Sequence, residues 1–133
     1  MAILLGAALA LGGCEYFLSD VATRIRYELL RQHAALQDSG EAERQFALRP
    51  DHWPDACPGD SGYRLRLSPY RGDKNVAVGD IFIECKGGGR YYTGLGAEAI
   101  YVTRELAIDK RADEDLIISL RRSERGTEIV RLQ

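Results

Sequence analysis

The sequence predicts an α+β domain in which an N-terminal amphipathic helix is followed by an antiparallel meander of about six strands. Apolar residues recur every three or four positions over residues 19–38, as on one face of a helix. From residue 63 onward they recur at every second position in short runs, as on one face of a strand. Short connections between the runs favour antiparallel neighbours. A small closed β-barrel with one helix is the alternative, because the same alternation would fit it.

The helix is predicted from an apolar stripe along one of its faces, and its other faces carry charged residues. Ser19 or Asp20 can cap its start, and Gly40 its end. We expect the stripe to pack on the sheet, although such a stripe can also bind lipid or a partner helix. It consists of Leu18, Ala22, Ile25, Leu29 and Leu36.

The segments between the helix and the second strand are less regular. Residues 41–48 are expected to add a short helical turn, and the prolines after them an irregular loop. Residues 63–67 alternate as a first strand. The second run begins at Val76 and Val78 and continues out of phase over 81–85, so Gly79 is expected to form a bulge.

Four further strands complete the predicted sheet. A glycine turn leads into the third strand, Arg104 interrupts the fourth at an inward position, and a turn at 123–126 joins the fifth to the sixth. The four strands cover residues 90–93, 100–108, 116–120 and 127–132.

Length and charge bound the possible functions. The chain has 133 residues, which suits one domain and is too short for two. It carries 18 Lys and Arg against 20 Asp and Glu, and the basic residues are spread along its length. This distribution lacks the basic patch of a nucleic-acid-binding protein, so no nucleic-acid partner is predicted.

The first thirteen residues, MAILLGAALALGG, contain no charged side chain. The apolar run stops well short of the roughly 20 residues that cross a bilayer, but its length suits the core of a secretory signal. The four residues Leu11-Gly12-Gly13-Cys14 then resemble the lipobox of bacterial lipoproteins. A buried N-terminal helix that ends in a glycine turn is the alternative.

The resemblance implies cleavage by signal peptidase II before Cys14, whose sulfur and amine would carry fatty chains such as palmitate. Residues 1–13 would be the signal peptide, and 14–133 a single periplasmic α+β domain whose lipid anchor binds the membrane. In that family the residue after the cysteine influences sorting, and Glu15 favours the outer membrane. Two or three acyl chains hold a protein at the bilayer permanently.

Cysteine parity agrees with this interpretation. If Cys14 is lipidated, Cys57 and Cys85 remain, and they can form a disulfide bond in an oxidising periplasm. Two unrelated buried thiols are the alternative, because Cys85 also fits as an inward residue of an apolar strand.

No catalytic site, metal site or cofactor is predicted. His52 with Asp51 and Asp55 would be the centre of a hydrolase or metal enzyme, but the residues meet no standard metal spacing. A proline-rich loop that uses the carboxylates for turns explains the same residues.

A partner-binding patch is the strongest surface prediction. Neighbouring strands could bring tyrosines and arginines together, the residue types enriched where proteins meet proteins. Ordinary packing on a half-buried sheet is the alternative. The predicted patch contains Tyr91, Tyr92, Tyr101, Arg90 and Arg104.

The sequence therefore suggests a lipid-anchored envelope protein at the outer membrane, facing the periplasm. It would act as a non-catalytic binding or assembly module with a protein partner in the envelope. A small periplasmic inhibitor or ligand-binding β-barrel is the second hypothesis, and an enzyme centred on His52 the third.

Overall fold

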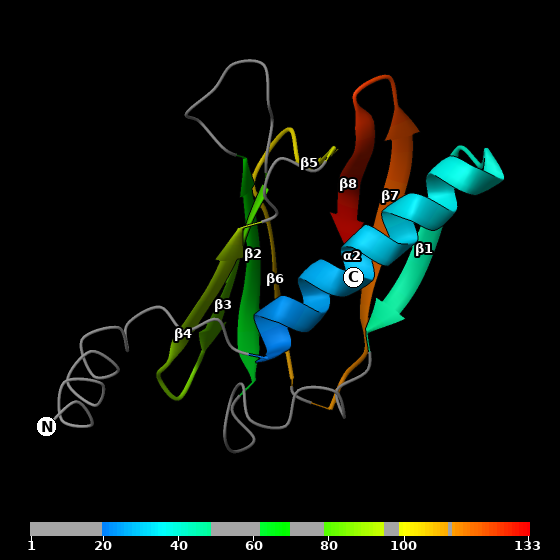
Figure 1. Ribbon diagram of the computed structural model, residues 1–133. Helices are drawn as coiled ribbons and strands as arrows, with labels where there is room; N and C mark the ends of the chain where they lie inside the picture. The colour runs from blue at the N-terminus through cyan, green and yellow to red at the C-terminus, as the bar shows by residue number, and fades with distance from the viewer. Residues whose placement is uncertain (1–19, 49–61, 70–78, 95–98, 112) are drawn as a thin grey trace, which may run out of the picture.

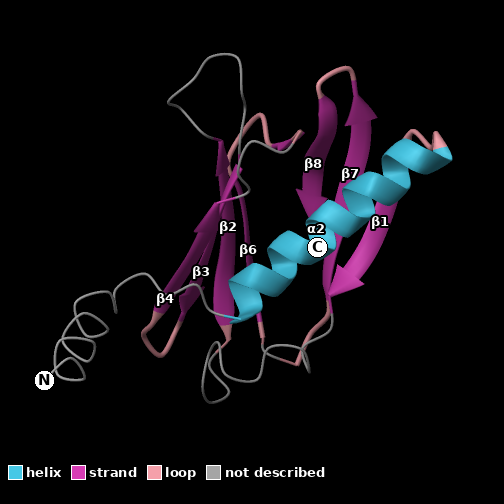
Figure 2. Ribbon diagram, viewed as in Figure 1, coloured by secondary structure: helices cyan, strands magenta, loops and turns pink. Residues whose placement is uncertain are grey.

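The computed structural model describes residues 20–48, 62–69, 79–94, 99–111 and 113–133. Within these ranges one helix lies across two four-stranded sheets, whose strands are drawn as arrows in Figures 1 and 2. The helix contacts strands of both sheets. This arrangement confirms the α+β class.

The helix α2 (Asp20–Ser39) agrees with the predicted span to within one residue at each end. Its buried side follows the expected spacing and contains one polar residue, Gln32. Gly40 follows the helix with φ +73°, a left-handed conformation that suits glycine, and its carbonyl accepts a hydrogen bond from Arg122 (2.7 Å). The buried apolar positions are Ile25, Leu29 and Leu36.

The first sheet, called sheet A, has the order β4-β3-β2-β6, and all its pairs are antiparallel. Its side chains alternate between the core and the opposite, outer face, as the period of two predicts. Its strands are β2 (Tyr63–Pro69), β3 (Gly79–Cys85), β4 (Arg90–Gly94) and β6 (Leu106–Lys110).

The second sheet, called sheet B, has the order β1-β7-β8-β5. The pair β5–β8 is parallel and the other two pairs are antiparallel. The register of β7 with β8 shifts between Ser119 and Leu120. Its strands are β1 (Glu43–Leu48), β5 (Ile100–Tyr101), β7 (Leu116–Ser123) and β8 (Gly126–Leu132).

The predicted meander of about six strands is wrong. The described residues form eight strands in two sheets, and β1 pairs with β7, whereas β2 pairs with both β3 and β6. Because both sheets are open, the closed-barrel alternative is also wrong for the described part of the chain. Short connections favour neighbouring strands, but they do not decide which distant strand completes a sheet.

Three local predictions are corrected as well. Residues 41–48 were expected to form a helical turn but contain β1, because Phe46 and Leu48 bury their side chains while pairing with β7. Gly79 forms no bulge: it starts β3 opposite Pro69 with no break in register. Val76 and Val78 lie outside the described residues.

The predicted fourth strand is divided between the sheets. Its first part is β5 in sheet B and its second part is β6 in sheet A, so the chain changes sheet over residues 102–105. Arg104 lies in this connection and is exposed, whereas the sequence suggested an inward position.

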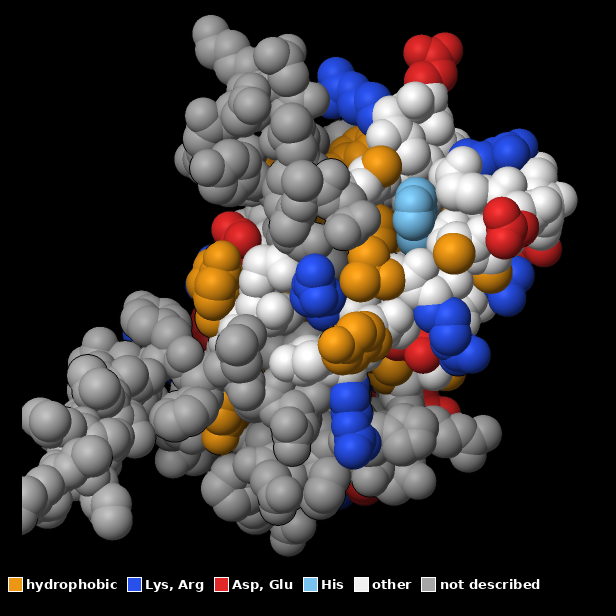
Figure 3. Space-filling model, viewed as in Figure 1, with side chains coloured by type: hydrophobic (Ala, Val, Ile, Leu, Met, Phe, Trp, Pro, Cys, Tyr) orange, Lys and Arg blue, Asp and Glu red, His pale blue; other side chains and the backbone are white. Residues whose placement is uncertain are grey.

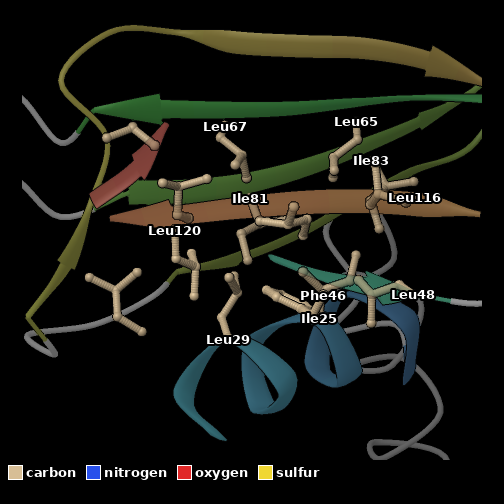
Figure 4. Close-up of a cluster of buried hydrophobic side chains, with 14 of the residues drawn as sticks. Ile25, Leu29, Phe46, Leu48, Leu65, Leu67, Ile81, Ile83, Leu116 and Leu120 are labelled. Atoms are coloured by element: carbon tan, nitrogen blue, oxygen red, sulfur yellow. The ribbon is translucent and has the colours of Figure 1, made fainter. Parts of the chain in front are cut away.

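One apolar core fills the space between α2 and the two sheets. In Figure 4, Ile25 and Leu29 of α2 lie opposite side chains from β1, β2, β3 and β7. The core is therefore built from both sheets at once, and the helix holds them together. Its further members are Leu36, Phe46, Leu48, Tyr63, Leu65, Leu67, Ile81, Ile83, Cys85, Ile100, Val102, Leu116, Ile118, Leu120 and Ile129.

Candidate interaction surface

The outer face of sheet A carries an ordered set of charged and aromatic side chains. They occupy the outward positions of the four strands, which alternate with the buried core positions. The set consists of Arg64, Arg66, Ser68, Asp80, Phe82, Glu84, Arg90, Tyr92, Ala107 and Asp109, together with Glu105 just before β6.

The first row across the strands alternates in charge. Arg90 on β4 lies opposite Glu84 on β3, Glu84 opposite Arg64 on β2, and Arg64 opposite Asp109 on β6. Arg64 donates two hydrogen bonds to Asp109, from Nε to Oδ1 (3.0 Å) and from Nη2 to Oδ2 (3.2 Å). These hydrogen bonds are the main reason why the pKa of Asp109 lies below its ordinary value and that of Arg64 above it.

The second row is aromatic at one end and cationic in the middle. It runs from Tyr92 through Phe82 and Arg66 to Ala107. The ring centroids of Phe82 and Tyr92 are 5.1 Å apart, and the guanidinium carbon of Arg66 lies 4.4 Å from the centroid of Phe82. This distance is within the range of a cation–π interaction.

Two carboxylates hold Arg66 in place, and a third orients Tyr92. The Arg66 nitrogens lie 3.3 Å from Glu84 and 3.2 Å from Glu105. The Tyr92 hydroxyl donates to Asp80 (3.0 Å). The side chains of this row are therefore fixed before any partner arrives, which lowers the entropy cost of binding.

The face is open to solvent. The side chains of Arg64 and Glu105 are 54% and 56% exposed. Its arginines and aromatic residues are types enriched in protein interfaces. Its carboxylates stand between the arginines and would repel a phosphate backbone, so the arrangement suits a partner with charges of both signs.

A second polar group, made of Glu28, Gln32 and Arg44, joins α2 to β1 of sheet B. Gln32 of α2 bonds both Glu28 and Arg44, and Arg44 belongs to β1. Figure 3 shows basic and acidic side chains interspersed on the molecular face that carries α2. We assign this group to helix docking because each bond joins α2 to itself or to a strand.

The predicted tyrosine and arginine patch does not form one surface. Tyr91 and Tyr92 are neighbours on β4 and therefore point to opposite faces, and Tyr91 packs against the core. Tyr101 is buried in sheet B, where its hydroxyl donates to Ser123. Arg104 is exposed in the connection between the sheets. Only Arg90 and Tyr92 share the outer face of sheet A.

Sequence reasoning missed Arg66, Phe82 and Glu84. The alternation of β2 and β3 already indicated outward positions for all three. The sequence did not indicate the strand register, which sets Arg66 between Phe82 and Ala107.

Cys85 is disulfide-bonded. Cys14 and Cys57 lie outside the described residues, so the pairing of Cys57 with Cys85 stays a prediction. His52, Asp51 and Asp55 also lie outside them. In the described part of the chain, no three His, Cys, Asp or Glu side chains are grouped so that they could hold a metal ion.

No protein-family model, curated protein or solved structure matches the chain. Among the described residues, none of the helical segments has the length and apolarity that a bilayer crossing requires.

Proposed function

We propose that the protein is a lipid-anchored protein of the bacterial cell envelope that acts as a non-catalytic binding module. The observation that carries this proposal is the disulfide bond at Cys85. Stable disulfide bonds belong to oxidising compartments such as the periplasm. An exported chain with three cysteines, one of them lipidated, leaves two for a single bond.

The distance between the anchor and the domain supports the same proposal. Asp20, the start of α2, lies six positions after Cys14, and a chain of that length spans at most about 20 Å. The first residue of the described core is Ile25, eleven positions after Cys14. Lipid on Cys14 would therefore hold the domain within one protein diameter of the bilayer.

The outer face of sheet A is the binding surface of this module. Its arginines and aromatic rings are held in place by contacts within the chain, and its side chains remain half-exposed. Facing the periplasm from the outer membrane, it would meet proteins of the envelope.

The test compares the full-length chain with Cys14→Ser in a Gram-negative host. We expect the wild-type protein to partition with membranes, to lack residues 1–13 and to carry acyl mass, whereas Cys14→Ser carries no lipid. Cys57→Ser is the matched control, which should lose the disulfide bond and keep the lipid. A purified native protein that retains Met1 or has no acyl mass would contradict the proposal.

A further inference from the structure

We infer that the outer face of sheet A binds the same face of a second copy of this chain. The inference rests on the proposed function in that it names the partner of the binding module. It is carried by the order of the side chains on the face. This order is complementary to itself about a two-fold axis parallel to the strands, but not about a two-fold axis perpendicular to them.

The favourable axis runs parallel to the strands, between β2 and β3. Rotation about it places β4 over β6 of the second copy and β3 over β2. Glu84 then faces Arg64 of the second copy, and Arg90 faces its Asp109. By symmetry each of these oppositions occurs twice, so the first row makes four contacts between opposite charges.

The same rotation also places the second row over itself, as it does a third row in which Asp80 of β3 lies opposite Ser68 of β2. Phe82 faces Arg66 of the second copy, which repeats between chains the cation–π contact already present within one chain. Asp80 faces Ser68, an uncharged residue whose hydroxyl donates to Glu105 of its own chain (3.2 Å). No like charges meet among these residues.

A two-fold axis perpendicular to the strands brings like charges of the same residues together. Rotation about a line across the strands, through the second row, brings Arg66 over its own copy. It also sets Glu84 against Asp80, and Asp109 near Glu105. Like charges brought together in an interface strongly oppose binding, so this arrangement is excluded.

The size of the face sets the strength of the dimer. Four strands about 4.8 Å apart, with five residues each at about 3.4 Å, give roughly 300 Å² of flat surface. Stable interfaces bury about 800 Å² per partner. We therefore expect weak self-association that relies on charge and is promoted where an anchor concentrates the chains on one surface.

The test uses the full chain in two tagged forms, co-expressed and captured from detergent extracts. Arg64→Glu places two glutamates opposite each other in its own dimer, and Glu84→Arg places two arginines there. Each variant alone should capture itself at least tenfold less than the wild type. The mixture of the two restores both opposite-charge contacts and should recover capture close to the wild-type level.

Arg121→Glu is the matched control, since Arg121 is 53% exposed and pairs with Glu128 on sheet B (2.9 Å). It breaks a similar ion pair elsewhere and should not change self-capture. Recovery in the mixture also shows that both variants fold. A mixture no better than either variant alone would overturn the inference.

Sedimentation of the wild-type chain in detergent measures its self-association without any substitution. Self-association should weaken several-fold between about 50 and 500 mM salt, because salt screens the charge contacts. A chain that stays monomeric at about 100 µM protein in low salt would also overturn the inference. The same measurement on Cys14→Ser separates this outcome from a failure of lipidation, since the dimer contacts do not include the lipid.

Discussion

The Nδ1 atom of His33 lies 2.6 Å from the hydroxyl of Thr127, so one hydrogen bond joins the middle of α2 to β8. Thr127 is fully buried, and its hydroxyl also accepts a hydrogen bond from the side-chain amide of Gln37 (3.3 Å). Gln37 reaches the carbonyl of Gly126 as well (3.2 Å). The apolar stripe drives α2 onto the sheets, and these directional bonds fix its position along β8.

Replacing Thr127 with Val keeps the volume and removes the hydroxyl. His33, which is half-buried, and Gln37, which is exposed, then lose a shared partner, so we expect the free energy of unfolding to fall by about 1 kcal/mol. Urea denaturation measures this loss. Thr103→Val is the control, because Thr103 bonds Glu128 at the surface (3.2 Å) and should change stability by less than about 0.5 kcal/mol. Equal losses in both variants would contradict the role given to Thr127.

Leu29 is completely buried between α2 and the sheets. Leu29→Ala leaves a cavity, and we expect a loss of about 2–5 kcal/mol in the free energy of unfolding. Tyr27 lies on the same helix but is 63% exposed, so Tyr27→Ala should cost less than about 0.5 kcal/mol. Thermal and urea denaturation of the two variants tests whether the buried stripe, rather than helix propensity, holds α2 in place.

Gly126 starts β8 with φ +133°, and a Cβ atom there would lie 2.2 Å from the carbonyl oxygen of Ala99. Gly88 has a similar φ of +101°, but a Cβ atom there would meet nothing within 4 Å. Gly88→Ala should therefore show the conformational cost alone, about 1 kcal/mol. Gly126→Ala should lose clearly more, because Thr127 donates its backbone N–H to the same Ala99 carbonyl and the clash forces them apart. Similar denaturation midpoints for the two variants would contradict this expectation.

Acid should weaken the ion pair between Arg64 and Asp109. The pKa of Asp109 is lower in the folded chain, chiefly because Arg64 donates hydrogen bonds to its carboxylate. A carboxyl group with a lowered folded pKa adds stability above its unfolded pKa of about 3.9, and this stability is lost as the pH falls through the folded pKa. Titration of Asp109 by NMR should show its pKa returning toward the ordinary value in Arg64→Gln. An unchanged titration would contradict the pairing.

The sequence predicted those elements that are decided by local pattern. The span of α2 follows from its apolar spacing and from Gly40, and β2 follows from strict alternation after Tyr63. It did not predict β1, because a short segment with mixed charges becomes a strand only by pairing with β7, about seventy residues later. The division of residues 100–108 between two sheets has the same cause.

The candidate surface was predicted only in part. Arg90 and Tyr92 were expected in a partner-binding patch and lie on the outer face of sheet A. Tyr91 was grouped with them because it is adjacent in sequence, although the alternation of a strand sends it to the other side. Register between distant strands decides which outward residues become neighbours, and one sequence alone does not contain it.

The pairing of β1 with β7 and of β5 with β8 also sets the order in which the protein can assemble. β1, near the start of the domain, has no partner until the strands beyond Leu116 are available. If the chain is exported as proposed, sheet B cannot be completed in the cytoplasm while its later strands are still being made. Sheet B therefore stays incomplete until nearly the whole domain has been made.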